Sequence, residues 1–463
     1  MKSERLDKIQ YRKNQSIKDV LKGFEQTAVY TEHGGFGVII DQDGKCCGVV
    51  TDGDIRRKVL NGISINMPIA EAMNSKFVFT KPGDSPHEIL RLFDHRINNI
   101  PVIDERGELV DLLQISNFNA SARVEHKIIR SRVPVRISFS GGGTDMSYFI
   151  NQNQSAVLSS TINKYCYASI LVRPDNKIRI VSKDLNQKCE VESLDKLKYG
   201  NSLDLIKASV KIMQPDFGFD LEVLSEFECG TGLGGSSAVS VAIIGAFNYF
   251  RNENHLDKYH IADLAYQAER IELNNTGGWQ DQYSTSFGGI NWIEFRENEI
   301  MVHPLRVSRD VMLELHYNLL LFRFGKNRVS GDISCDQKQR FQDKKAVMRE
   351  KYMQMYRLTK EMKEALLRGK LKRFGDLLDE CWNLKKSFSD KVSNALVEKL
   401  YNAARMEGAL GGKVLGAGGG GYLLLYVSPL YQKAVCGTLE ELGARHEPFD
   451  FTDEGLETWA TQR

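Results

Sequence analysis

The chain contains three glycine-rich segments that lie far apart in the sequence, and no other feature restricts its fold and ligand as strongly. They are residues 134–145 (PVRISFSGGGTD), 230–237 (GTGLGGSS) and 416–421 (GAGGGG). Each segment carries or neighbours the charged and hydroxyl side chains that phosphoryl transfer uses. A fold that brings all three together predicts a site built around a phosphate-bearing ligand.

The second segment, residues 230–237, has the clearest physical basis. Residues 219–225 alternate apolar and polar side chains as a half-buried strand does, and residues 239–250 are apolar enough for a buried helix. Glycines between them let backbone N–H groups face an anion, and the helix start adds partial positive charge. A serine hydroxyl there is also an oxygen ligand for Mg²⁺. We expect a phosphate loop; the alternative is a tight strand-to-helix turn that binds nothing.

Two common nucleotide-binding motifs do not explain this loop. Gly230, Gly232 and Gly235 match G-x-G-x-x-G, but no second strand ending in an acidic residue follows about 20 positions later, as dinucleotide binding requires. No Gly-Lys-Ser or Gly-Lys-Thr follows any of the glycine segments, so a Walker loop is also excluded.

The composition is typical of a soluble globular protein. With 463 residues, 42% of them hydrophobic and 26% charged, the chain is long enough for about two or three domains. A net charge of +2 gives no strong attraction to nucleic acid or membrane, and no apolar run is long enough to span a bilayer. The eight cysteines form no C-x-x-C pair, and the first residues lack a signal-peptide core. We expect a cytoplasmic protein without disulfides or zinc.

Residues 1–125 contain an internal repeat. Residues 37–55 hold two apolar segments joined by a turn, and residues 100–117 repeat the arrangement, with Gly44 of the first turn matched by Gly107 of the second. Two similar halves can bury their apolar faces against each other as one module. The pattern resembles a tandem cystathionine-β-synthase (CBS) pair, a Bateman module of α/β fold.

The CBS resemblance implies a site for an adenine nucleotide. In that family a Thr and an Asp spaced as Thr51 and Asp54 contact the ribose, whereas the second copy has Gln114 and Asn117. We therefore expect one regulatory nucleotide site per module. The alternative is a purely structural module or one through which the chain forms a homodimer. Residues 119–127, small and polar, are the predicted linker to the rest of the chain.

Beyond the linker the sequence mixes strands and helices. We expect strands at residues 128–140, 166–172 and 178–182, and two charged amphipathic helices at residues 337–369 and 370–386.

Two carboxylates between the second and third glycine segments are candidates for chemistry. Asp281 lies in a predicted loop, from which it can orient an attacking hydroxyl and accept its proton, a solvated side chain being the alternative. Glu269 lies at the edge of an apolar helical stripe, where it needs a partner such as Mg²⁺. Arg270 is a poor partner because it points about 100° away around the helix. Glu272 shares the stripe, so periodicity leaves both glutamates open.

Taken in order, the three glycine segments resemble the motifs of the GHMP kinases, the superfamily of galactose, homoserine, mevalonate and phosphomevalonate kinases. The resemblance spans residues 128–463. It implies an α+β fold with a ribosomal S5 domain 2-like N-terminal part and a ferredoxin-like C-terminal part. We expect three domains: the CBS pair at 1–125, an ATP-binding subdomain at 126–305 and a C-terminal subdomain at 306–463.

The resemblance also implies an ATP- and Mg²⁺-dependent reaction with assigned residues. Asp281 is the expected catalytic carboxylate, and Arg136 is expected to support the transferred phosphate. Ser237 and Glu269 are the expected Mg²⁺ ligands. The ATP phosphates are expected on Gly230, Thr231, Gly232, Leu233, Gly234, Gly235, Ser236 and Ser237. The sugar is expected on Gly141, Gly142, Gly143, Thr144, Asp145, Gly418 and Gly419. One departure is Glu228-Cys229, where the family usually has proline before the loop.

Within the superfamily, the glycine motifs and residues 382–389 (WNLKKSFS) are most similar to D-glycero-D-manno-heptose 7-phosphate kinases. Such enzymes phosphorylate the anomeric hydroxyl in nucleotide-activated heptose synthesis. Lys385 and Lys386 are then the cations expected to bind the sugar's own phosphate. The alternatives are a kinase of the fucose or galactose type, or a nucleotide-binding regulatory protein that has lost catalysis. The intact set of Arg136, Ser237, Glu269 and Asp281 argues against the loss.

Overall fold

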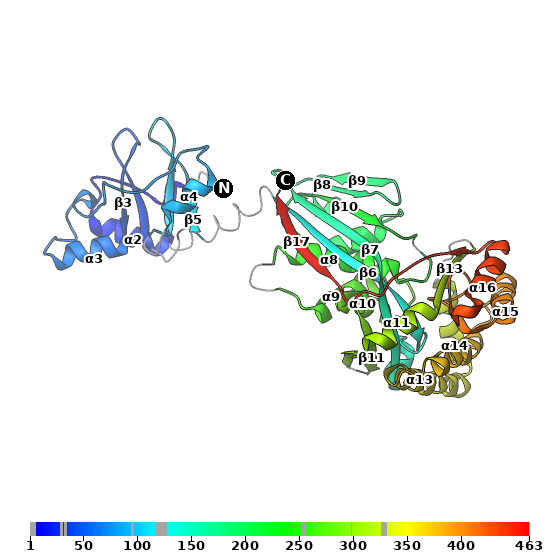
Figure 1. The fold of residues 1–463 in the computed structure, drawn as a ribbon. Coiled ribbons are helices and arrows are strands. Elements are labelled where there is room, and N and C mark those ends of the chain that lie inside the picture. Colours follow the sequence, from blue (N-terminus) through cyan, green and yellow to red (C-terminus); the bar gives the residue numbers. More distant parts are fainter. Residues whose placement is uncertain are drawn as a thin grey trace. The chain divides into compact units, whose positions relative to one another are not determined.

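The computed structural model shows a chain of two compact units, residues 1–126 and 127–463, which we describe separately (Figure 1). The structure describes residues 6–27, 31, 35–93, 97–115, 127–228, 230–251, 255–297, 299–325 and 331–462. Asn117, Cys229 and most of the predicted linker lie outside the described residues.

The first unit contains two related halves. The first half holds β1 (Gln10–Arg12), α2 (Ile17–Thr27), β2 (Phe36–Ile40), β3 (Cys46–Thr51) and α3 (Asp52–Leu60). The second holds α4 (Pro86–Leu92), β4 (Asn99–Ile103) and β5 (Leu109–Gln114), after a short 3₁₀ turn, η2 (Ile69–Glu71). In both halves the turn between the two antiparallel strands ends at a glycine with positive φ, 83° at Gly44 and 86° at Gly107. This conformation explains the repeated glycine. The Cys46 N–H donates to the Gly107 carbonyl at 2.8 Å and joins the halves.

The second unit is built on a large, mostly antiparallel sheet. Its strands are β6 (Lys127–Ser140), β7 (Ser155–Val172), β8 (Ile178–Ser182), β9 (Gln187–Val191), β10 (Phe219–Ser225), β11 (Ile290–Arg296), β12 (Glu299–Pro304) and β17 (Glu457–Gln462). They run in the order β12-β11-β7-β10-β8-β9, and β6 pairs with both β7 and β17. Inward-facing Val133, Val135, Ile137 and Phe139 of β6 are fully buried, so this long strand is the centre of the core.

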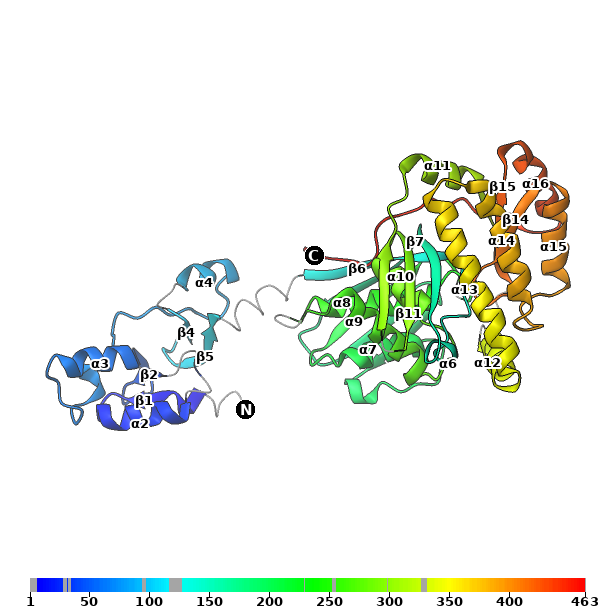
Figure 2. The same ribbon diagram turned by 90° about the horizontal axis from the view of Figure 1, so that it is seen from below.

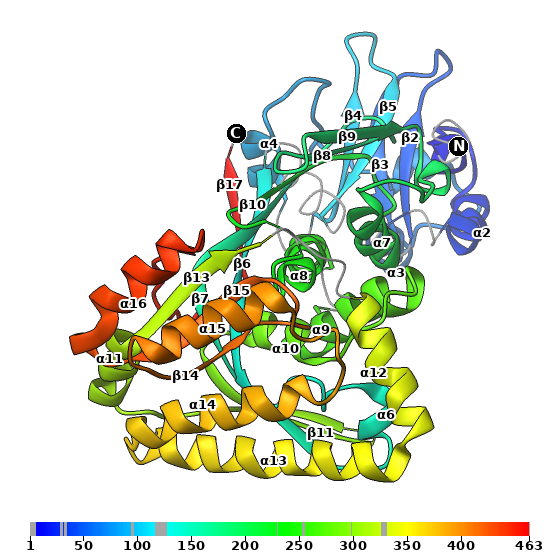
Figure 3. The same ribbon diagram turned by 90° about the vertical axis from the view of Figure 1, so that its right-hand side faces the viewer.

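Helices cover one face of this sheet (Figure 3). α8 (Gly235–Asn248) and α10 (Gln280–Phe287) pack directly on β6 and β7, while α7 (Asp204–Met213) and α9 (Lys258–Tyr266) pack beside α8. Shorter elements are α6 (Ser147–Ile150), η3 (Leu194–Lys196) and the π-helix η4 (Gln267–Glu272). α8 and α10 also pack against each other, since both helices rest on the same two strands.

The C-terminal part has a sheet of its own. β13 (Leu319–Phe324), β14 (Ala409–Val414), β15 (Gly421–Val427) and β16 (Arg445–His446) run in the order β14-β15-β13-β16, with α15 (Ala395–Met406) and α16 (Pro429–Glu441) as the connecting helices. This β-α-β-β-α-β order is ferredoxin-like, as expected. α11 (Arg309–Asn318) and α12 (Gly331–Asp343) precede a helical hairpin of α13 (Lys345–Leu367) and α14 (Leu371–Lys386), whose helices lie side by side (Figure 2). α13 packs on β7 and α14 on β14, so the hairpin connects the two sheets.

The structure corrects two predictions of local structure. The helix predicted at 337–369 is two helices that break at Lys344, whose backbone leaves the helical region (φ −129°, ψ 48°). Asp281 lies in α10 and not in a loop. The helix was missed because its buried residues include Gln282, Ser284 and Thr285, so no apolar period marks it. None of the helices in the described part of the chain combines the length and apolar character that a membrane crossing needs.

Candidate active site

The three glycine segments meet at one place in the second unit. A Cβ on Gly232 would lie 2.5 Å from the Leu415 carbonyl oxygen, and one on Gly416 would lie 2.6 Å from the Gly232 Cα. The second and third segments therefore pack backbone against backbone. The first segment joins them through Arg136, whose backbone N–H donates to the Leu233 carbonyl at 3.0 Å. Glycine at Gly232 and Gly416 is therefore a steric requirement of the contact between the second and third segments.

The second segment ends at the start of α8 in a form suited to an anion. Gly234, the residue before the helix, has φ 76°, a conformation that favours glycine. No side chain caps the helix start within the described residues, so its first N–H groups are available to a ligand. Ser236 and Ser237 lie in this first turn and point their hydroxyls at one carboxylate, that of Glu269.

Glu269 is the glutamate that faces the phosphate loop. Its carboxylate accepts hydrogen bonds from Ser236 Oγ at 2.5 Å, Ser237 Oγ at 3.0 Å and Gln282 Nε2 at 2.9 Å. The residue is buried. Glu272, the alternative, is exposed and accepts a hydrogen bond from the Tyr199 hydroxyl at 2.8 Å. Of the two glutamates that periodicity left open, only Glu269 lies beside the serines.

The expectation that Arg270 points away from Glu269 is wrong. Its Nη1 lies 3.3 Å from Glu269 Oε1, and its side chain is only 12% exposed. Both residues belong to η4, a π-helical turn wider than an α-helical one, in which neighbours still point in different directions, so it is the long arginine side chain that reaches back to the carboxylate. The sequence gives no signal for this widened turn.

The chemistry of this corner fits a magnesium ion. Two hydroxyls and a carboxylate converge there, and all are hard oxygen donors of the kind that Mg²⁺ takes together with water and phosphate oxygens. The described residues contain no group of three or more His, Cys, Asp or Glu side chains arranged to hold a metal. A cation at this corner would therefore need further oxygens from a bound ligand.

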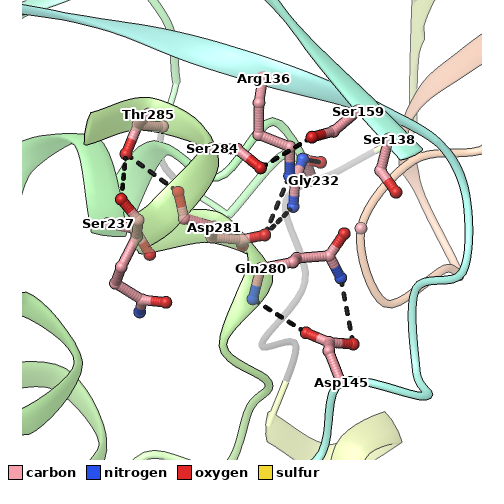
Figure 4. Close-up of polar contacts among 12 residues, drawn as sticks. Arg136, Ser138, Asp145, Ser159, Gly232, Ser237, Gln280, Asp281, Ser284 and Thr285 are labelled. Carbon is pink, nitrogen blue, oxygen red and sulfur yellow. Dashed lines mark hydrogen bonds and ion pairs between the residues drawn. The ribbon is translucent and has the colours of Figure 1, made fainter. Parts of the chain in front are cut away.

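Asp281 and Arg136 form the centre of the site (Figure 4). Arg136 Nε and Nη2 donate to Asp281 Oδ1 at 2.9 and 2.6 Å, and Nη1 donates to the Gly232 carbonyl at 2.5 Å. The Arg136 side chain is 2% exposed and that of Asp281 is 18% exposed, so the carboxylate is the half of the pair that a ligand can reach. Arg136 thus ties Asp281 to the phosphate loop.

A second carboxylate, Asp145, lies next to this pair. It is buried and accepts hydrogen bonds from the Gly143 and Gln280 backbone N–H groups at 2.9 and 3.1 Å. Burial raises the pKa of Asp145 above its ordinary value. A Cβ on Gly278 would lie 2.0 Å from Asp145 Oδ2, and one on Gly277 would lie 2.3 Å from Arg270 Cζ. Each glycine of this pair therefore makes room for one charged side chain.

Two lysines are buried near Asp145. Lys385 donates to the Gly416 carbonyl and lines the same crevice as Asp145 and Asp281. Burial and the nearby Arg136 lower the pKa of Lys385 to about 8. Lys413, which we did not select from the sequence, donates to the Ser138 carbonyl at 2.7 Å. Burial and Lys385 lower its pKa well below the ordinary value. In the sequence, Lys413 stands out only as a charged residue in a segment of apolar residues and glycines.

Lys386 faces elsewhere. Its ammonium lies 3.2 Å from a Glu398 carboxylate oxygen, outside the crevice that Lys385 lines. The two lysines that the sequence grouped therefore point in different directions, as neighbours on a helix do.

The other expected sugar residues have structural contacts in the described chain. The buried Thr144 hydroxyl donates to the Gly141 carbonyl at 2.8 Å, and Gly419 N–H donates to the Val392 carbonyl at 2.8 Å. A Cβ on Gly418 would also meet Val392, while Gly142 lies beside Gln280 and the Ser138 hydroxyl. The Ser138 Oγ and Gln280 Oε1 atoms are buried without a hydrogen-bond partner among the described residues. They are polar groups that a bound ligand would satisfy.

In the first unit, Thr51 and Asp54 cap α3. Asp54 N–H donates to Thr51 Oγ1 at 3.1 Å, and Asp54 Oδ2 accepts from the Thr51 N–H at 3.0 Å. Arg57 Nη2 lies 2.6 Å from Asp54 Oδ1. These contacts make a capping box, so both residues have a structural role that does not require a nucleotide.

The sequence and the fold match those of known proteins. Residues 204–289 match the GHMP kinases N terminal domain, residues 362–443 match the GHMP kinases C terminal domain, and residues 11–61 and 69–116 match the CBS domain. A D-glycero-alpha-D-manno-heptose 7-phosphate kinase of Campylobacter jejuni is 35% identical over 339 residues, which cover 72% of this chain and 99% of that protein. The chain belongs to the GHMP kinases. It is an ATP-dependent sugar kinase of this family, with a CBS pair at residues 11–116.

Other relatives of this kinase differ in the sugar their names give. The crystal structure of a D-glycero-D-manno-heptose 1-phosphate kinase from Bacteroides thetaiotaomicron is 28% identical, has a TM-score of 0.60 and covers 72% of this chain and 98% of its own. An L-fucokinase/L-fucose-1-P guanylyltransferase of Bacteroides fragilis is 26% identical over 67% of this chain and 36% of that longer protein. The kinase region is thus shared with enzymes for phosphorylated and free sugars.

Proposed function

We propose that this kinase transfers the terminal phosphoryl group of ATP to the anomeric hydroxyl of a heptose 7-phosphate, as a step of nucleotide-activated heptose synthesis. The proposal rests on the burial and the position of Lys385. A buried ammonium is costly unless a charge compensates it, and this buried lysine lines the crevice that also holds Asp145 and Asp281. A substrate that brings its own phosphate would supply that compensation, whereas a free sugar would not.

The described residues have different roles in such a reaction. The 230–237 loop binds the ATP phosphates through its backbone N–H groups, and Ser237 with Glu269 holds the Mg²⁺ that neutralises them. Asp145 accepts hydrogen bonds from sugar hydroxyls. Asp281 orients the attacking hydroxyl and takes its proton, and Arg136 keeps Asp281 in place.

A second candidate substrate is a heptose 1-phosphate, which the name of the Bacteroides thetaiotaomicron relative favours. Either sugar can place its own phosphate on Lys385. The two sugars differ in which end then faces Asp281. The two candidates therefore differ in the position of the new phosphate and not in the residues involved.

The test incubates the full chain with ATP, Mg²⁺ and each of four acceptors: heptose 7-phosphate, heptose 1-phosphate, free heptose and L-fucose. Phosphorus NMR of the product locates the new phosphate. We expect turnover of heptose 7-phosphate and a new phosphate on the anomeric oxygen. Turnover confined to a free sugar would contradict the proposal.

Variants of the two lysines provide a matched pair for the same test. Lys385→Met should raise the KM for the sugar phosphate at least about tenfold, since one charge-assisted phosphate contact is lost. Lys386→Met, whose lysine pairs with Glu398, should leave that KM unchanged. Equal effects of both changes would remove Lys385 from the substrate site.

A further inference from the structure

Arg136, the arginine expected at the transferred phosphate, has most of its hydrogen-bonding capacity engaged by the protein. A guanidinium has five N–H donors. Three of those of Arg136 are occupied, two by Asp281 Oδ1 and one by the Gly232 carbonyl. The side chain is also almost completely buried. These contacts suit a residue that positions Asp281 and the phosphate loop, and they leave little of it to receive a new anion.

Arg270 is also largely buried, but fewer of its donors are engaged by the described residues. Its one recorded contact with a charged group is the 3.3 Å approach of Nη1 to Glu269, and its Nε is buried without a hydrogen-bond partner among the described residues. An unsatisfied buried donor on a cation is costly, so it indicates a missing anionic partner. The guanidinium is held against Gly277, where only the absence of a Cβ gives it space.

Arg270 also lies where the two halves of the site meet. One crevice is lined by the phosphate loop with Ser236 and Glu269, and the other by Asp145 and Lys385. Arg270 lines both crevices, and so do Asp281 and Arg136, but Arg136 has its donors turned to Asp281 Oδ1 and the Gly232 carbonyl. A phosphoryl group that moves from nucleotide to acceptor has to cross between these crevices, beside the carboxylate that holds the acceptor hydroxyl.

We propose that Arg270 is a catalytic residue that binds the oxygens of the phosphoryl group during transfer, while Arg136 serves as a positioning residue for Asp281. In the step, the acceptor oxygen forms a bond to the terminal phosphorus of ATP as the bond to the bridging oxygen breaks. The hydroxyl proton goes to Asp281, and ADP leaves with the bonding electron pair. Arg270 exchanges no proton. Negative charge spreads over the three outer oxygens in such a transition state, and an arginine fork matches them. The inference rests on the proposed assignment of residues 230–237 to the ATP phosphates.

The experiment compares wild type with Arg270→Gln and Arg270→Lys, using whichever sugar the wild-type chain phosphorylates. We expect Arg270→Gln to lower kcat by roughly 10³-fold, in the range found for arginines that stabilise phosphoryl transfer. The KM values for ATP and sugar should change little, and Arg270→Lys should recover part of the loss. Wild-type inactivity towards heptose phosphates would count against the proposed substrate alone, because the comparison uses any accepted sugar.

A binding measurement separates this role from a structural one. Calorimetry with ADP plus aluminium fluoride, in the presence of Mg²⁺ and the sugar, measures the affinity for a complex that mimics the phosphoryl group during transfer. Arg270→Gln should weaken this complex by about as large a factor as kcat, with the affinity for ADP alone unchanged. Equal weakening of both complexes would overturn the proposal in favour of a ground-state nucleotide contact. A selective rise in the KM of the sugar phosphate would overturn it in favour of the acceptor's own phosphate.

A second variant, Gly277→Ala, keeps Arg270 but displaces the end of its side chain. The Cβ of Gly277→Ala would overlap the guanidinium carbon at 2.3 Å, so the side-chain end has to shift. We expect a kcat loss in the same direction as that of Arg270→Gln, with unchanged thermal stability. Gly437→Ala, at a helical glycine with nothing within 4 Å of the added Cβ, is the control and should retain full activity. Wild-type kcat in both Arg270→Gln and Gly277→Ala would overturn the proposal.

Discussion

Asp281 has one carboxylate oxygen committed and one available. Both hydrogen bonds from Arg136 end on Oδ1, and no group in the described chain is recorded as donating to Oδ2. Asp281→Asn keeps the shape of the side chain but cannot accept a proton. We expect kcat to fall by roughly 10²–10⁴-fold while ATP affinity persists, as steady-state kinetics and calorimetry will measure. Near-wild-type turnover would remove Asp281 from the chemistry.

Lys385 gives the reaction a dependence on pH. Burial and Arg136 oppose its protonation, whereas Asp145 and Asp281 favour it. Because the ammonium binds the sugar phosphate, KM for that substrate should be constant below the pKa of about 8 and rise as the pH increases through it. Lys385→Met should abolish this rise in a KM–pH profile. A rise that persists in the variant would assign the titration to another group.

The same lysine affects stability in a predictable direction. Its folded pKa of about 8 lies below its ordinary value of 10.5, so the unfolded state binds more protons between these pH values. The free energy of unfolding should therefore rise with pH across that window. At neutral pH the burial costs about 3 kcal/mol, and Lys385→Met should melt at a higher temperature than wild type. A lower melting temperature in calorimetry would show that the Gly416 contact outweighs the buried charge.

At the scale of elements, apolar periodicity located helices and strands but did not fix all their bounds, since the helix predicted at 337–369 is two helices that break at Lys344. The strand predicted at 219–225 is β10 with the same bounds. The helix containing Asp281 was missed because polar residues fill its buried face, and neither the π-helical turn η4 nor the contact of Arg270 with Glu269 has a signature in composition. Ser237, Glu269, Arg136 and Lys385 were named from the sequence, with the choice of Glu269 over Glu272 resting on the family resemblance. The buried Lys413 and the contact of Arg270 with Glu269 were not predicted, because the direction of a side chain is a property of the folded chain.

The π-helix makes a testable distinction between its two glutamates. Glu269→Gln replaces the carboxylate beside Ser236 and Ser237 by a weaker ligand for a hard cation, so the Mg²⁺ concentration for half-maximal activity should rise several-fold. Glu272→Gln is the matched control three residues along, and it should leave the Mg²⁺ requirement unchanged. A Mg²⁺ titration of both variants decides the assignment, and the reverse order of effects would refute it.

At the scale of the whole molecule, we expect the CBS pair to bind one adenine nucleotide through Asp54 and to change kinase activity. Asp54→Asn keeps an oxygen for the helix cap but loses acceptor capacity for two ribose hydroxyls. Calorimetry of the full chain with AMP or ATP should show one site fewer in the variant. If a nucleotide regulates the kinase, the coupling free energy should be about 1–3 kcal/mol. Unchanged binding in Asp54→Asn would leave the pair as a structural or dimerising element.

The pairing of β17 with β6 has a consequence for how the kinase is made. Arg132 of β6 and Glu457 of β17 are ion-paired across 325 positions of sequence. During synthesis, β6 and β7 emerge early, yet the outer edge of β6 remains unpaired until residues 457–462 have left the ribosome. An open strand edge is a template for association with other chains, and such distant pairing is slow to form. Nascent kinase that stalls before β17 should therefore be a substrate for chaperones, and synthesis of that last strand is the event that ends its exposure.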